Sequence, residues 1–204
     1  MVMRDDLQKL LAEHGLRCLG DCADGGATIT LIGPDEPGFW DIFTASSEYG
    51  DGQPDPLDRW SARVIGAVAT QMGAEPLFPF GGPPYAPFHT WAVASGQAWP
   101  SPIGFLVHRD AGLFVSFRGA LRWQVTADVS TASSPCPTCA RPCKSACPVG
   151  AFAQGYDVAA CKAHVGSDAG QDCRLGGCLA RRACPVGQGN RLPAQAQFHM
   201  EAFL

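Results

Sequence analysis

The 204-residue sequence lacks the signatures of several large protein classes. No apolar run approaches the roughly 20 residues that a membrane-spanning helix needs. There is no glycine-rich phosphate loop, no G-x-G-x-x-G motif after an expected strand and no G-x-S-x-G turn. These are the usual motifs of nucleotide hydrolases, dinucleotide-binding folds and α/β-hydrolases, so the sequence predicts none of these three classes. His89, His164 and His199 have no partners at metal-ligand spacing. No Asp or Glu lies between Glu75 and Asp110.

Charged residues are also scarce, and they are unevenly placed. They make up 17% of the chain against 46% hydrophobic residues, a balance that predicts a folded protein. Residues 1–135 hold eight Lys and Arg against fifteen Asp and Glu, whereas residues 136–191 hold seven Lys and Arg against three Asp. The first residues place two aspartates ahead of a leucine stripe, which predicts a helix and not a secretory signal. We therefore expect a cytoplasmic protein that binds no membrane.

Hydrophobic periodicity predicts a mixed α/β front domain over residues 1–130. A first helix is expected to run to about Leu16, and a strand is expected over residues 26–33. A longer helix should begin after Asp55 as N-cap, with Pro56 in its first turn.

Further along the chain, residues 103–125 are expected to form a hairpin. Two apolar stretches flank a turn in which Gly112 supplies the positive φ. Residues 131–135 are small and polar, as in a linker. A cysteine-rich module over 136–190 and a tail over 191–204 complete the expected organisation.

Cysteine is the residue that the sequence has in excess. Ten are present, and clustered cysteines in a reducing compartment bind metal or carry redox chemistry more often than they form disulfides. Three of the clustered cysteines precede proline, and two of these, Cys147 and Cys184, stand in a pentapeptide Ala-Cys-Pro-Val-Gly that occurs at 146–150 and again at 183–187. Eight cysteines lie within 49 residues: Cys136, Cys139, Cys143, Cys147, Cys161, Cys173, Cys178 and Cys184.

This spacing is typical of a module that holds two [4Fe–4S] clusters. In two-cluster bacterial ferredoxins, three closely spaced cysteines bind one cluster, and a fourth, followed by proline, binds the other. Proline fixes φ and turns the chain away toward the second cluster. Because the exchange works in both directions, the last cysteine of each group should precede proline, as Cys147 and Cys184 do. We assign one cluster to Cys136, Cys139, Cys143 and Cys184. The other is assigned to Cys147, Cys161, Cys173 and Cys178.

The charge of the segment agrees with this assignment. Each cluster with its four thiolates carries about −2, so two contribute about −4. Seven cations against three aspartates in residues 136–191 balance that charge. These cations are therefore interpreted as charge compensation and as steering for a redox partner protein, and not as a nucleic-acid surface.

Two points stay open from the residues alone. The spacing is looser than in the bacterial form, so the pairing of cysteines between the clusters is not fixed. Zinc in two Cys₄ sites is the alternative metal, although zinc modules favour paired C-x₂-C knuckles and only one is present. Cys18 and Cys22 are predicted to be small, partly buried thiols near the end of the first helix.

The 136–190 segment resembles the ferredoxin-type module of epoxyqueuosine reductase and of the corrinoid-dependent reductive dehalogenases. Those proteins also have a four-cysteine run ending in Cys-Pro, a lone cysteine about fifteen residues later and a three-cysteine group ending in Cys-Pro. The resemblance covers about a quarter of the chain and is specific for clusters, not for a substrate. Epoxyqueuosine reductase carries a proton-donating acid in the stretch where this chain has none.

Residues 101–121 resemble the hairpin of the cobalamin-processing, CblC-type family. Gly104, His108, Gly112, Arg118 and Gly119 stand at the spacings found there. The resemblance implies a nitroreductase-like α/β core that binds a corrinoid or a flavin, with Arg118 at the ligand pocket. From the residues alone, His108 simply ends a strand and Arg118 pairs with an aspartate.

Together these features predict an α+β redox protein with a ferredoxin-like iron–sulfur module. It would transfer electrons to a corrinoid or flavin in its own front domain, or to a partner; as an enzyme it would be an oxidoreductase. The first alternative is a cobalamin-binding and delivery protein that reduces cobalt for release. The second is a structural zinc protein.

Overall fold

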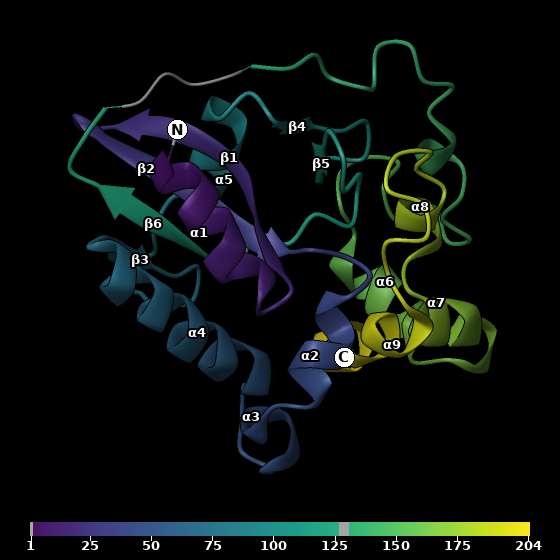
Figure 1. Ribbon diagram of the computed structural model, residues 1–204. Coiled ribbons are helices and arrows are strands. Elements are labelled where there is room, and N and C mark those ends of the chain that lie inside the picture. The colour runs from purple at the N-terminus through teal and green to yellow at the C-terminus, as the bar shows by residue number, and fades with distance from the viewer. Residues whose placement is uncertain (1, 127–130) are drawn as a thin grey trace. The chain divides into compact units, whose positions relative to one another are not determined.

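The computed structural model describes residues 2–126 and 131–204 and divides into two compact units (Figure 1). The first contains Met1–Gln97 and Ser116–Ala132, and the second contains Ala98–Val115 and Ser133–Leu204. Helices and small antiparallel sheets occur together, so the expected α+β class is confirmed. None of the described helices has the length and apolar character needed to cross a bilayer. The expected end of the front domain at residue 130 lies outside the described residues.

The first unit is built on four antiparallel strands: β1 (Leu16–Asp24), β2 (Ala27–Pro34), β6 (Gly119–Trp123) and β3 (Glu75–Leu77), in that order across the sheet. β2 is central and buried along its whole length, which explains its run of β-branched and small residues. The strand expected over residues 26–33 is therefore confirmed. β6 completes the core of the sheet from a distant part of the sequence.

Five helices accompany this sheet: α1 (Val2–Ala12), α2 (Phe39–Thr44), α3 (Ser47–Gly50), α4 (Pro56–Met72) and α5 (Phe88–Ala94). α4 contacts β3 and β6, beside which Figure 1 shows it lying. It buries Trp60, Val64 and Val68 at helical spacing, as the sequence predicts. Pro56 stands in its first turn, and Asp55, with a φ of +51°, directly precedes it at the N-cap. The predicted N-cap position of Asp55 is therefore confirmed, although its side chain does not form the usual capping hydrogen bond.

The first helix is shorter than expected. It ends at Ala12, and Gly15 turns the chain with a φ of +63° into β1. This strand escaped prediction because a bulge between Cys18 and Gly20 breaks its alternation. Cys18 and Cys22 consequently lie on β1 and not at a helix end. Cys22 is buried and Cys18 half-buried, and burial raises the pKa of each thiol to about 11.

The second unit consists of short elements joined by turns: β4 (Ala98–Pro100), β5 (Leu106–His108), the 3-10 helices η1 (Pro142–Lys144) and η2 (Asp168–Gly170), and the helices α6 (Val158–Val165), α7 (Gln171–Gly176), α8 (Leu179–Arg182) and α9 (Pro193–Phe203). α7 packs against α9, and α8 packs against η1. The β4–β5 segment belongs to this unit, although the sequence suggests a place in the front domain. It therefore shares a unit with the cysteine-rich segment.

The hairpin expected over residues 103–125 is wrong in its pairing. β5 pairs with β4, while β6 pairs with β2 and β3 in the other unit. The tight turn itself is present, because the backbones of His108 and Gly112 exchange two hydrogen bonds of 3.0 Å. Gly112 has a φ of +58°, as its place in the turn requires. After the turn the chain leaves this unit, so the second stretch cannot pair with the first.

Candidate metal centre

Four cysteines surround one narrow pocket of the second unit. Cys143 is held by η1, and Cys184 follows α8. Burial raises the pKa of the Cys143 thiol, and the neighbouring thiols of Cys184, Cys136 and Cys139 raise it further. The four thiols therefore lie close together. We call them quartet A: Cys136, Cys139, Cys143 and Cys184.

The other four clustered cysteines surround a second pocket. Cys161 lies on α6, Cys173 on α7, and Cys178 directly before α8. Burial raises the pKa of the Cys173 thiol, and the neighbouring thiols of Cys147 and Cys161 raise it further. We call these residues quartet B: Cys147, Cys161, Cys173 and Cys178.

The two quartets interlock along the chain. Cys147 follows the three closely spaced cysteines of quartet A but lines the pocket of quartet B, and Cys184 follows Cys178 but lines the pocket of quartet A. Each is followed by a proline that lines the same pocket as its cysteine, Pro148 in one case and Pro185 in the other. This is the grouping expected from the spacing. That the thiols bind iron–sulfur clusters stays a prediction.

Two glycines allow the loop after Cys184 to lie against the β5 turn. A Cβ atom on Gly112 would stand 2.0 Å from the carbonyl oxygen of Val186 and 3.4 Å from the sulfur of Cys184. A Cβ atom on Gly187 would stand 2.6 Å from the carbonyl oxygen of Ala111. Neither position tolerates a larger residue without movement of the backbone. The turn therefore fixes where Cys184 lies.

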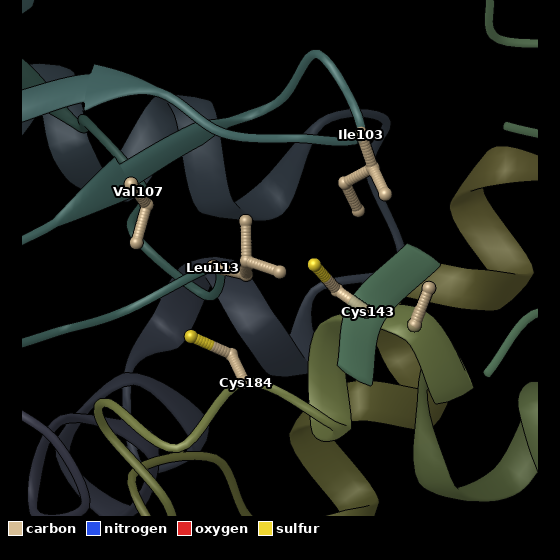
Figure 2. Close-up of a cluster of buried hydrophobic side chains, with 6 residues drawn as sticks. Ile103, Val107, Leu113, Cys143 and Cys184 are labelled. Atoms are coloured by element: carbon tan, nitrogen blue, oxygen red, sulfur yellow. The ribbon is translucent and has the colours of Figure 1, made fainter. Parts of the chain in front are cut away.

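Apolar side chains of the β4–β5 segment cover quartet A. Ile103, Val107 and Leu113 are at most 5% exposed and form one buried cluster with Cys143 and Cys184. Figure 2 shows the sulfur atoms of both cysteines on the side of Leu113. Water is thereby kept from this side of the pocket. No local sequence signal connects these residues to the cysteines, because the contact spans about thirty or more residues of chain.

Quartet B is bordered by aromatic residues that the sequence did not single out. The rings of Phe152 and Tyr156 stack with centroids 5.1 Å apart, and Phe105 from the β4–β5 segment meets both edge-on. Phe152 lines the pocket, and burial together with a hydrogen bond to Cys161 raises the pKa of Tyr156. His164, which stands at no recognisable ligand spacing, also lines this pocket.

Backbone amides point at sulfur atoms of both quartets. The N–H of Arg141 donates to the sulfur of Cys139 at 3.3 Å, and the N–H of Ala151 donates to the sulfur of Cys147 at 3.4 Å. Such hydrogen bonds stabilise a thiolate and, in iron–sulfur proteins, raise the reduction potential of the cluster. Quartet B receives further backbone hydrogen bonds, at Cys173 and Cys178.

The two candidate residues outside the quartets are already engaged. His108 ends β5 and is 2% exposed, and its Nδ1 accepts hydrogen bonds from the N–H groups of Asp110 and Ala111 at 3.1 and 3.2 Å. Arg118 lies in the first unit, forms an ion pair with Asp58 and donates from Nε to the Ser61 hydroxyl at 3.1 Å. The pairing with an aspartate is one of the two expected arrangements. A role for Arg118 in a ligand pocket stays a prediction.

In the part of the chain that the structure describes, no three His, Cys, Asp or Glu side chains converge as ligands of a single ion would. Comparison with protein-family models, curated proteins and solved structures found no match to this chain. The chemistry of the centre is therefore inferred from its own residues.

Proposed function

We propose that this chain is an electron-transfer protein in which quartets A and B each hold one [4Fe–4S] cluster. One observation carries the proposal: eight thiols from a 49-residue stretch gather as two interlocked quartets, each lining its own pocket. Interlocking of this kind is the arrangement of two-cluster ferredoxins, in which the cysteine before proline serves the other cluster.

The donor set fits such clusters. Each quartet offers four thiols, the ligands that iron–sulfur clusters require. All ten cysteines are free, as expected in the reducing cytoplasm, where we place the protein. Seven cations against three aspartates in residues 136–191 offset the negative charge that two clusters would bring.

The residues around the quartets would shield and tune the clusters. When bound, the clusters supply one-electron transfer at low potential. Ile103, Val107 and Leu113 keep water from quartet A. Surroundings without water favour the less charged oxidation state of a bound cluster. Cys143 and Cys147 are four residues apart, so their Cα atoms lie within about 14 Å of each other and the two sites are neighbours.

The electron acceptor is proposed to be a redox partner protein, or a corrinoid or flavin bound by the first unit. The second possibility rests on the resemblance to the nitroreductase-like, CblC-type fold, whose five marker residues are divided between the two units. Arg118 would serve a ligand there only after its ion pair with Asp58 opened. An oxidoreductase activity would follow if such an acceptor were a substrate.

Metal and sulfide analysis tests the proposal. After anaerobic purification, we expect about eight iron atoms and eight acid-labile sulfides per chain, with broad absorbance in the visible range. Cys22→Ala, which removes a buried thiol of β1, should leave both values unchanged. About two zinc atoms without sulfide would instead establish the structural zinc protein and overturn the proposal.

A further inference from the structure

A third pocket of the second unit lies beside quartet A. It has a volume of about 400 Å³, within the range of about 300–1,000 Å³ that is usual for small-molecule sites. Cys184 forms part of its wall, together with Phe114. Three arginines contribute to the lining: Arg181, Arg182 and Arg191. Among the described residues, no Asp or Glu lines this pocket.

Two of these arginines are held in place by Phe114 and its neighbour. The guanidinium carbons of Arg181 and Arg191 stand 4.9 and 5.0 Å from the centroid of the Phe114 ring. Arg181 donates from Nε to the carbonyl oxygen of Leu113 at 2.7 Å, and Arg191 donates from Nη2 to the carbonyl oxygen of Phe114 at 2.9 Å. Contacts with a ring and with backbone oxygens orient both guanidinium groups.

The third arginine and a glycine loop complete the pocket. Arg182 forms an ion pair with Asp172, to whose Oδ1 its Nη1 donates at 2.7 Å, and the Arg182 side chain remains 37% exposed. Gly187 and Gly189 have φ values of +71° and +78°, and a Cβ atom on Gly189 would meet nothing within 4 Å. Turns with such glycines let main-chain amides approach an oxyanion. The three arginines and the loop with Gly187 and Gly189 therefore line the same pocket.

We propose that this pocket binds the phosphate group of a small molecule. Arginine forks match the oxygens of a phosphate in a bidentate manner, and three of them line a space that is large enough for a phosphate and the group attached to it. The concave shape suits a small molecule better than a flat protein surface. The arginines and the glycine loop make these contacts whichever metal keeps the second unit folded. Because Cys184 forms part of the wall, a bound molecule would lie beside quartet A; that it is redox-active rests on the proposed function.

The competing explanation is that the arginines only balance the charge of a cluster on quartet A. The full chain, with its metal content measured on the same sample, is titrated with inorganic phosphate, flavin mononucleotide and riboflavin in phosphate-free, low-salt buffer. We expect flavin mononucleotide to bind at least about tenfold more tightly than riboflavin, and inorganic phosphate to compete with it. Tighter binding of flavin mononucleotide than of phosphate identifies a phosphate monoester as the ligand class; the reverse identifies free phosphate.

Matched variants locate the site. Arg182→Gln removes an exposed cation of the pocket, and Arg191→Lys keeps the charge but loses the bidentate fork; each should weaken phosphate binding about tenfold or more. Arg109→Gln removes an exposed cation of the same unit that does not line the pocket, and should change binding less than twofold. All three should keep the iron content of the unsubstituted chain.

Two results would overturn the site. One is the absence of binding for both phosphate probes at millimolar concentration. The other is an equal loss of affinity in Arg109→Gln and Arg182→Gln, which would indicate a diffuse charge effect. Failure of the proposed function is a separate result: a chain without iron that still binds phosphate, and loses it in Arg182→Gln, keeps the anion site and loses the clusters.

Discussion

Glycine and proline determine where the thiols of the second unit lie. Both copies of Ala-Cys-Pro-Val-Gly end on a glycine with positive φ, +62° at Gly150 and +71° at Gly187. In both, the proline lines the pocket of its own cysteine. The surroundings differ, however: a Cβ atom on Gly150 would meet nothing within 4 Å, whereas one on Gly187 would stand 2.6 Å from the carbonyl oxygen of Ala111. The pentapeptide at 146–150 therefore ends in open surroundings, whereas the one at 183–187 ends against the backbone of another segment.

This difference predicts unequal effects of the same substitution. Gly150→Ala should cost only the strain of a positive φ, about 1–2 kcal/mol of unfolding free energy. Gly187→Ala adds a clash with the backbone and should cost about 3 kcal/mol or more. It should also lower the iron content, because the loop that carries Cys184 must move. Anaerobic urea unfolding and iron analysis measure both effects, and equal losses in the two variants would contradict the close packing.

At the residue scale, the sequence predicts what local spacing encodes. The eight cysteines and the positive φ of Gly112 follow from neighbours within a few positions, and the grouping follows from the proline after the last cysteine of each group. Leu113 and Phe105 could not be identified in this way, because their roles depend on contacts with distant segments. Arg118 pairs with Asp58, which lies 60 residues away. Nothing in the sequence distinguishes Asp58 from the other aspartates as this partner.

At the scale of the elements, an ion pair connects two helices of the first unit. Glu48 in α3 receives two hydrogen bonds from Arg63 in α4, at 2.5 and 3.0 Å. The Arg63 guanidinium holds the pKa of Glu48 at about 2, well below its usual value. Stability gained from this depression is present above the usual pKa of a glutamate and is lost as the pH falls toward 2.

Glu48→Gln should therefore destabilise the first unit in a pH-dependent manner. The Arg63 side chain is 55% exposed, so the expected loss at pH 7 is only about 1 kcal/mol of unfolding free energy. The difference from the unsubstituted chain should shrink between about pH 4.5 and pH 2, because Glu48 itself becomes protonated there. Thermal unfolding at a series of pH values measures it. Asp41→Asn, at an exposed position of α2, should show no comparable trend; a pH-independent loss in Glu48→Gln would contradict the ion pair.

Which elements the sequence predicts depends on how regular their patterns are. α4 presents an uninterrupted apolar stripe and ends at Gly73, which has a φ of +66°. The sequence does not predict β1, because the bulge between Cys18 and Gly20 breaks its alternation. The 103–125 hairpin was mistaken because two apolar stretches around a turn suggest pairing with each other, whereas β6 gains more contacts between β2 and β3.

At the scale of the whole molecule, the two units of the chain have different cores. The first has a sheet with large buried side chains such as Trp60 and Phe43. The second combines two separate stretches of sequence, and its buried apolar residues are few and mostly small. If the proposed clusters are bound, a unit of this kind would depend on them for its core.

Removal of metal should therefore unfold one unit and spare the other. After oxidation of the clusters in the presence of a chelator, we expect amide hydrogen exchange to accelerate at least about a hundredfold in α6, α7 and α8. The central strand β2 should keep its protection, because its buried face does not involve the quartets. Exchange measured by mass spectrometry on peptides of each unit tests this, and equal acceleration in both units would contradict it.

The most direct test of the account is which cysteines share a cluster. The measurement is the electron paramagnetic resonance spectrum of the reduced, anaerobic protein in four variants, Cys136→Ala, Cys184→Ala, Cys147→Ala and Cys173→Ala, with Cys22→Ala as control. The interlocked quartets predict one remaining spectrum common to the first two variants and a different one common to the last two, with the control unchanged. A spectrum shared by Cys136→Ala and Cys147→Ala, with Cys184→Ala matching Cys173→Ala, would mean that neighbours in sequence share a cluster and would contradict the account.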